Sequence, residues 1–143
     1  MNNSAISTYI IDDDPFYSNL IANWLFEKYK ANIKMYNDAE SCLKEINQTP
    51  DIIFLDYNLF QEEKQNMDGN TALSALLEKN PKLKIVMLSS VENPYVVSEA
   101  IKNGAADYVL KNDDTIYNLN RIMKGISIYK EYLKKYNNLE FED

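Results

Sequence analysis

The sequence predicts a doubly wound α/β fold, in which helices cover both faces of a parallel β-sheet. Short apolar runs alternate with segments of helical periodicity along the chain, and most of the runs are apolar throughout, as in strands buried on both faces. Right-handed crossovers would place the connecting helices on both sides of such a sheet. No internal repeat, Gly/Ser-rich linker or shift in composition divides the chain, so we expect a single domain over residues 1–143.

Five strands and five helices are expected in alternation. The strands should cover residues 7–12, 32–36, 51–56, 83–88 and 106–110. Capping residues, proline or glycine mark the helix starts, at Asp14-Pro15, Asp38, Gly69 and Pro94. The first helix carries apolar residues at helical spacing: Phe16, Leu20, Ile21, Trp24 and Leu25. In the second strand, Ile33 and Met35 should share one face.

The last helix is expected over about residues 115–136. A stripe on it should pack on the sheet: Ile116, Leu119, Ile122, Met123 and Ile126. Tyr129, Tyr132, Leu133 and Tyr136 continue the spacing beyond that stripe. Two interpretations stay open for them: a simple extension of the helix with an aromatic surface, or a contact face for a partner or a second copy.

Composition excludes several classes of function. The net charge is −7, from 15 basic and 22 acidic residues, which argues against direct binding of nucleic acid. The absence of histidine removes the usual zinc sites and Ser-His or Cys-His catalysis, so a metal would need oxygen ligands, as Mg²⁺ does. With a single cysteine, Cys42, no apolar run of membrane-spanning length and no signal-peptide pattern, we expect a cytoplasmic protein without membrane contact. Cys42 itself should be a core residue of the second helix.

Polar residues whose side chains can bind ligands or take part in a reaction follow the apolar runs. They are Asp12, Asp13, Asp56, Ser89 and Lys111. In an open parallel sheet the carboxyl ends of the strands meet at one edge, where such folds place their sites. Three acids, a hydroxyl and an amine should therefore share one pocket, which indicates phosphoryl chemistry on an aspartate.

These residues and their surroundings closely resemble the receiver domain of two-component response regulators, over about residues 5–130. The motifs that carry the resemblance are Ile-Ile-Asp-Asp-Asp-Pro, Ile-Ile-Phe-Leu-Asp, Met-Asp-Gly, Met-Leu-Ser-Ser and Gly-Ala-Ala-Asp-Tyr-Val-Leu-Lys. The resemblance implies a flavodoxin-like three-layer sandwich with strand order 2-1-3-4-5. It also implies a stand-alone receiver.

The resemblance assigns a role to each residue of the acidic group. Asp56 would be the phosphoacceptor, because a carboxylate can hold a phosphoryl group as an acyl phosphate. Asp13 would bind Mg²⁺ directly, Asp12 largely through water, and Asn58 through its backbone carbonyl. Asp14 precedes a proline and is better used as a helix cap, which leaves Asp12 and Asp13 facing the site.

The remaining site residues would bind and report the phosphoryl group. Ser89 and Lys111 would contact its oxygens. Tyr108 stands where receivers carry a switch aromatic, whose ring turns inward as the Ser89 hydroxyl moves toward the phosphoryl group.

Two departures from the family pattern stand out. Phe60 replaces the usual proline, and residues 60–66 make the segment between Asp56 and Gly69 about five residues longer than is usual in the family. Surface loops tolerate insertions of this size at a small cost in entropy. Asn112 replaces the proline that commonly follows the lysine, so a cis peptide is not expected there and the geometry of Lys111 is less constrained.

The expected function is therefore that of a non-enzymatic receiver, phosphorylated on Asp56 with Mg²⁺ by a sensor histidine kinase or a histidine phosphotransfer protein. It would then act on a downstream protein or relay the phosphoryl group, and a homodimer is possible. The main alternative is a receiver-like protein-binding module that signals without phosphorylation. An aspartyl phosphatase would need an acid where Asn58 stands, and Asp12–Asp14 would repel the phosphate of a flavin.

Overall fold

The computed structural model describes residues 5–59 and 67–141, with side chains as far as Asn137. Its sheet has five parallel strands in the order β2-β1-β3-β4-β5. The strands are β1 (Ser7–Ile11), β2 (Asn32–Tyr36), β3 (Ile52–Asp56), β4 (Ile85–Ser89) and β5 (Asp107–Leu110). The predicted fold class and strand order are confirmed.

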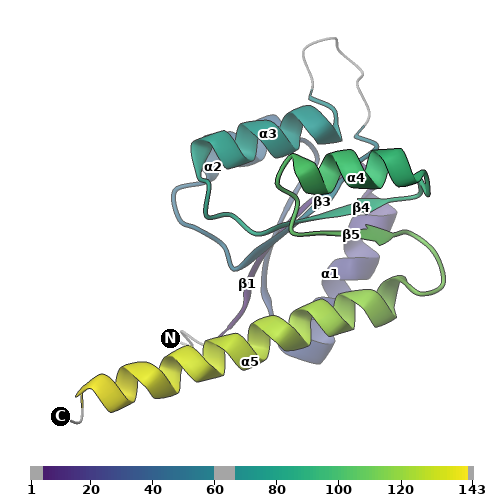
Figure 1. Ribbon diagram of the computed structural model, residues 1–143. Coiled ribbons are helices and arrows are strands. Elements are labelled where there is room, and N and C mark those ends of the chain that lie inside the picture. Colours follow the sequence, from purple (N-terminus) through teal and green to yellow (C-terminus); the bar gives the residue numbers. More distant parts are fainter. Residues whose placement is uncertain (1–4, 60–66, 142–143) are drawn as a thin grey trace.

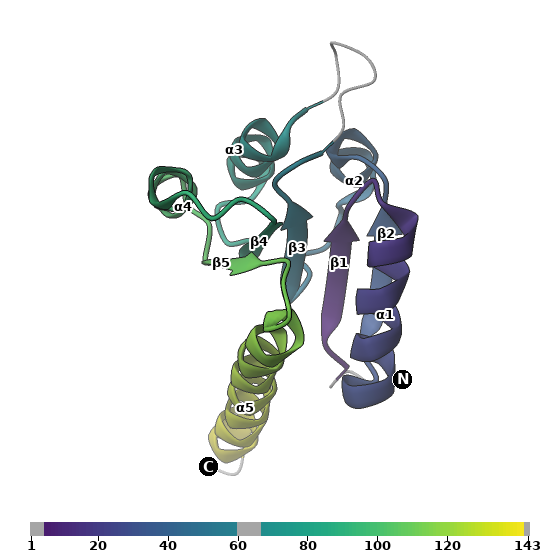
Figure 2. The same cartoon turned by 90° about the vertical axis from the view of Figure 1, so that its right-hand side faces the viewer.

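Helices cover both faces of this sheet. They are α1 (Pro15–Tyr29), α2 (Ala39–Glu45), α3 (Gly69–Lys79), α4 (Pro94–Lys102) and α5 (Thr115–Phe141). Helices α1 and α5 lie on one face and α2, α3 and α4 on the other (Figures 1 and 2). This is the three-layer arrangement expected for a doubly wound fold.

Alternation along the central strands separates the core into two halves. Ile53 and Leu55 of β3 pack toward α2 and α3, whereas Ile52 and Phe54 pack toward α1 and α5. All four side chains are fully buried, which explains why the strand is apolar at every position. Cys42 is fully buried in the first half, as predicted.

Side-chain caps fix the beginnings of the helices. Asp14 Oδ1 accepts hydrogen bonds from the backbone N–H groups of Phe16 (3.0 Å) and Tyr17 (3.3 Å), directly before Pro15. Asp38 accepts one from Ser41 (2.7 Å). These contacts satisfy donors that the first helical turn leaves unpaired, and they confirm both predicted helix starts.

Some apolar residues of the regular helix and strand patterns are exposed. Phe16 and Leu20 are 78% and 51% exposed, because α1 turns Ser18, Ile21, Ala22 and Leu25 toward the sheet. Met35 is half exposed on β2, an edge strand that no helix covers fully at that point. On α5 the packed stripe begins at Leu119, since Ile116 lies at the rim and is exposed. Strand β4 begins at Ile85, two residues later than expected.

Helix α5 is longer than the expected span of 115–136. No proline or glycine follows Tyr136 to end it, and it continues to Phe141. The packed stripe stops at Ile126, and α5 then projects beyond the sheet toward the C-terminus (Figure 1). Beyond this point the apolar side chains are exposed: Ile128, Tyr129, Tyr132, Leu133 and Tyr136. We call this exposed set the tail surface.

The predicted loop over residues 60–66, with Phe60, lies outside the described residues. In the described part of the chain, no helix has the length and apolar character needed to cross a membrane.

Candidate functional site

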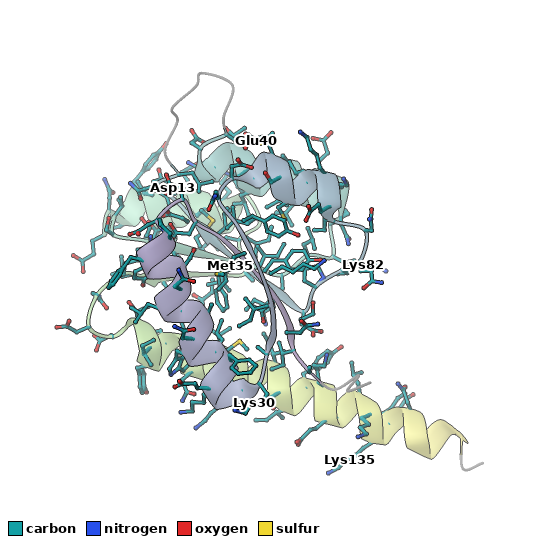
Figure 3. The ribbon with its side chains drawn as sticks, turned by 180° about the vertical axis from the view of Figure 1, so that it is seen from behind. Asp13, Lys30, Met35, Glu40, Lys82 and Lys135 are labelled. Carbon is teal, nitrogen blue, oxygen red and sulfur yellow. The ribbon has the colours of Figure 1, made fainter. Side chains whose placement is uncertain are left out.

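Three carboxylates meet at the carboxyl edge of the sheet. Asp12 directly follows β1, Asp56 ends β3, and these two strands are neighbours. One oxygen of each of Asp12, Asp13 and Asp56 lies within 4.8 Å of the others. Asp12 is 2% and Asp56 4% exposed, whereas Asp13 is half-buried at the start of α1 (Figure 3). The structure thus brings together the three acids that the sequence placed at strand ends.

Short backbone turns hold the two buried carboxylates in place. Asp12 Oδ1 accepts a hydrogen bond from the N–H of Asp14 (2.9 Å), and the N–H of Asp12 donates to the Tyr36 carbonyl (3.0 Å). Asp56 Oδ1 accepts from the N–H of Asn58 (3.0 Å). Because each carboxylate is tied to its own following turn, both are fixed before any ligand arrives.

Lys111 supplies the positive charge within this group. Its Nζ lies 3.1 Å from Asp12 Oδ2 and 3.3 Å from Asp56 Oδ1. Its backbone N–H donates to the Ser89 carbonyl (2.8 Å), which fixes the point from which the side chain extends. Burial tends to lower the pKa of Lys111, but the charges of Asp56 and Asp12 outweigh it, so the pKa is raised and the amine is charged.

Carboxylate charge nevertheless exceeds ammonium charge in the site. Burial and, to a smaller extent, the nearby charge of Asp56 raise the pKa of Asp12 to about 6, against the hydrogen bond from Asp14 and the charge of Lys111. A raised carboxyl pKa marks a place where additional positive charge would be stabilising. Closely spaced oxygen ligands of this kind suit a hard cation such as Mg²⁺, and Asp12, Asp13 and Asp56 could hold one.

Ser89 and Tyr108 form a second group beside the acids. The fully buried Ser89 hydroxyl donates to Asn58 Oδ1 (3.2 Å) and accepts from the N–H of Val91 (2.9 Å). The Tyr108 hydroxyl donates to the Val91 carbonyl (2.9 Å). Both predicted switch residues therefore bind Val91, at the beginning of the connection from β4 to α4. The side chain of Asn58 takes part as well, although the sequence had suggested only its backbone carbonyl.

Two residues beside Lys111 were not predicted from the sequence. The Tyr17 ring lies against the ammonium group, with Nζ 4.5 Å from the ring centroid. Thr115 fastens the loop that follows Lys111: its hydroxyl donates to the Leu110 carbonyl (2.7 Å) and accepts from the N–H of Asn112 (2.8 Å). A signal for Tyr17 was available, since it stands in the first turn of a helix that begins at the site.

Comparison with known proteins agrees with this geometry. The family model described as the response regulator receiver domain matches residues 8–126. The chain belongs to this family. Receiver domains of this family act in two-component signalling through phosphorylation, and the acidic group of Asp12, Asp13 and Asp56 fits such a site.

Relatives of this receiver domain differ in length. It is 31% identical over 103 residues to the chemotaxis protein CheY of Listeria monocytogenes, covering 71% of this chain and 82% of CheY. It is 36% identical over 103 residues to a protein-glutamate methylesterase/protein-glutamine glutaminase of Archaeoglobus fulgidus, covering 68% of this chain but only 28% of that protein. The receiver domain of NtrX from Brucella abortus superposes with a TM-score of 0.69 at 29% identity, covering 82% of this chain and 98% of that one.

Proposed function

We propose that this receiver domain accepts a phosphoryl group on Asp56 in a Mg²⁺-dependent reaction. One observation supports the proposal most strongly: a buried carboxylate at the end of β3 lies beside two further carboxylates and a lysine. A buried acid with these neighbours, at the carboxyl edge of a doubly wound sheet, matches the requirements for covalent phosphoryl transfer.

Asp56 would act as the nucleophile. An Asp56 carboxylate oxygen attacks phosphorus, the bond from phosphorus to the donor's imidazole nitrogen breaks, and the released imidazole nitrogen takes up a proton. Asp12, Asp13 and Asp56 would hold Mg²⁺, with the Asn58 backbone carbonyl as a further ligand; bound there, the metal supplies positive charge beside the transferred oxygens. The Lys111 ammonium would pair with one phosphoryl oxygen, in exchange for part of its contact with the carboxylates.

Phosphorylation would change the contacts around Val91. A phosphoryl group adds about two negative charges and strong acceptor oxygens. The Ser89 hydroxyl would then leave Asn58 for a phosphoryl oxygen, and the change would pass through Val91 to Tyr108, which binds the same residue. The segment from β4 to α4 is thereby the element that the modification biases.

The partners follow from this chemistry. We propose that a sensor histidine kinase or a histidine phosphotransfer protein supplies the phosphoryl group, and that residues 1–143 work as a single receiver domain without catalytic turnover of their own. The exposed Phe16 and Leu20 lie on α1, the helix that begins at the site, and give such a donor an apolar contact. The tail surface is available to a downstream protein or to a second copy.

Intact-mass analysis tests the phosphoacceptor. The protein is incubated with acetyl phosphate, with and without Mg²⁺, and in a second series with a phosphorylated histidine phosphotransfer protein. One added phosphoryl group is expected in the parent protein with Mg²⁺ and none in Asp56→Asn. The matched control is Asp51→Asn, directly before the opposite end of the same strand, which should be phosphorylated like the parent.

Rapid hydrolysis of the adduct is separated from its absence by titration with beryllofluoride, which binds without being turned over. No adduct and no beryllofluoride binding would refute the phosphoacceptor proposal. The protein would then be better described as a receiver-like binding module that signals by contacts alone.

A further inference from the structure

The loop that carries Lys111 lacks the proline that commonly follows this lysine in the family, yet Lys111 is placed firmly in the site. Its amine contacts two carboxylates, although a lysine side chain is a flexible stem with several accessible rotamers. Something else in this chain must limit those rotamers. The residues that touch Lys111 or its loop show how.

The backbone on either side of Lys111 is fastened by hydrogen bonds. Its own N–H binds the Ser89 carbonyl (2.8 Å), and Thr115, which is 5% exposed, binds both the Leu110 carbonyl and the Asn112 N–H. Asn112 Oδ1 also accepts from the N–H of Asp114 (2.8 Å). Hydrogen bonds from side chains thus close the turn that a proline would otherwise stiffen.

The Tyr17 ring also lies against the ammonium group. Nζ lies 4.5 Å from the ring centroid, well within the range of a cation–π contact. The backbone of Tyr17 is fixed in the first turn of α1, where its N–H is bound by the Asp14 cap, and its partly buried side chain packs against the core on the α1 and α5 side of the sheet. The two carboxylates and the ring therefore jointly fix the position of the ammonium group.

We propose that Tyr17 is a positioning residue for Lys111, holding the amine at the phosphoryl pocket through its aromatic face. A phosphoryl group would bind Lys111 and a cation would bind the carboxylates, and both would weaken the ion pairs between them. Neither would compete with Lys111 for the Tyr17 ring. The ring contact therefore persists while the ion pairs are exchanged. This inference rests on the proposed function for its consequence in phosphorylation, but the placement itself is a property of the unmodified protein.

Proton NMR of the lysine methylene groups tests the placement without any phosphoryl donor. Protons above an aromatic face are shifted upfield, so the Lys111 ε-methylene signal, assigned by its loss in Lys111→Met, should lie upfield of other lysines. Tyr17→Phe should keep this shift and Tyr17→Leu should abolish it. The matched control is Phe26→Leu, which removes the ring below Lys30 at the other end of α1 and should leave the Lys111 signal unchanged.

The rate of phosphorylation by acetyl phosphate then tests the role. Tyr17→Leu should be about fivefold slower than the parent, the effect of losing one partly buried cation–π contact, and Tyr17→Phe should be close to the parent. An ordinary Lys111 signal in the parent, or equal rates for the parent and a folded Tyr17→Leu, would overturn the inference. An upfield Lys111 signal that depends on the ring, in a protein that neither takes a phosphoryl group nor binds beryllofluoride, would support the placement and refute the proposed function instead.

Discussion

Asp12 shows how much a single buried carboxylate depends on its neighbours. It is almost fully buried, accepts the Asp14 N–H and pairs with Lys111, yet burial and Asp56 still raise its pKa to about 6. One ammonium group does not balance the carboxylates that meet there. The carboxylates could therefore hold a cation, and their closeness without one costs stability, as is common for functional residues.

A pH series measures this cost. Asp12 has a pKa of about 6 when folded and 3.8 as its ordinary value, so between these values the folded state binds the proton more tightly. The contribution of Asp12 to stability is greatest below pH 4 and is lost as the pH rises toward 6. Asp12→Asn does not titrate, and we expect its advantage in the free energy of unfolding over the parent to grow from pH 5 to 7, reaching about 1–2 kcal/mol.

Urea unfolding in the presence of a chelator, at several pH values, would show this trend. A difference between the two proteins that stays constant, or that shrinks as the pH rises, would contradict the assignment of the raised pKa to Asp12.

At the scale of elements, the beginning of α3 packs closely against the turn that follows β3. A Cβ on Gly69 would lie 2.5 Å from the carbonyl oxygen of Tyr57 and 2.6 Å from its Cα. The Gly69 N–H also donates to that carbonyl (3.2 Å). Since Tyr57 stands between Asp56 and Asn58, the glycine of the Met-Asp-Gly motif allows a helix to approach the backbone of the site closely.

Two alanine substitutions separate this close approach from ordinary helix propensity. Gly69→Ala should lower the free energy of unfolding by about 1–3 kcal/mol, because the clash is with backbone that has no rotamer to change. Gly125→Ala is the control: apart from its chain neighbours and the backbone of its own helix, no atom of the described residues lies within 4 Å of a Cβ added there, the site on α5 is exposed, and we expect a gain of up to about 1 kcal/mol. Equal effects of the two substitutions in urea unfolding would show that the contact at Tyr57 is not limiting.

The helices and strands, and the edge of the sheet that carries the site, were largely predictable because each depends on local sequence signals. Fully apolar runs gave the central strands, Asp14 and Asp38 gave the helix starts, and polar residues after strands gave Asp12, Asp56 and Lys111. Contacts between distant segments were not predictable in this way. Tyr17 meets Lys111, and Asn58 meets Ser89, only after helices and strands have packed, and no periodicity reports such pairs.

The same limit applies to the exposed apolar positions and to the end of α5. Phe16 and Leu20 are apolar residues at helical spacing, but which arc of α1 faces the sheet depends on its packing against β1 and β2. The sequence predicts the end of α5 too early because the apolar spacing ends at Tyr136 while the helix itself continues to Phe141.

At the scale of the whole molecule, the site and the far end of α5 lie at opposite ends. Figure 3 shows Asp13 at the beginning of α1 and Lys135 on the projecting part of α5. Lys130 ties α5 to the opposite edge of the sheet: its Nζ lies 2.8 Å from Asp51 Oδ2 and 3.3 Å from the Ala5 carbonyl. Asp51 also accepts the N–H of Ser7 (2.7 Å), so one carboxylate joins α5 to the segments that begin β1 and β3.

The projecting part of α5 therefore combines one anchor with the exposed tail surface, and substitutions should separate the two. Lys130→Met should lower the free energy of unfolding by about 0.5–1 kcal/mol, the range for a partly exposed ion pair with an added hydrogen bond. The double substitution Tyr129→Glu, Leu133→Glu should change it by less than about 0.5 kcal/mol, because these exposed side chains pack on no part of the described core. Neither variant should alter the proposed phosphorylation of Asp56.

Sedimentation of the same proteins then distinguishes the open interpretations of the tail surface. Self-association of the parent that the double substitution abolishes would identify a second copy as its occupant, since two glutamates would be buried in that contact. A parent that remains monomeric with and without beryllofluoride would show that a second copy does not cover the tail surface. A different protein or solvent would then contact it. A large loss of stability in the double variant would instead show that the tail surface belongs to the fold, against the exposure of its side chains.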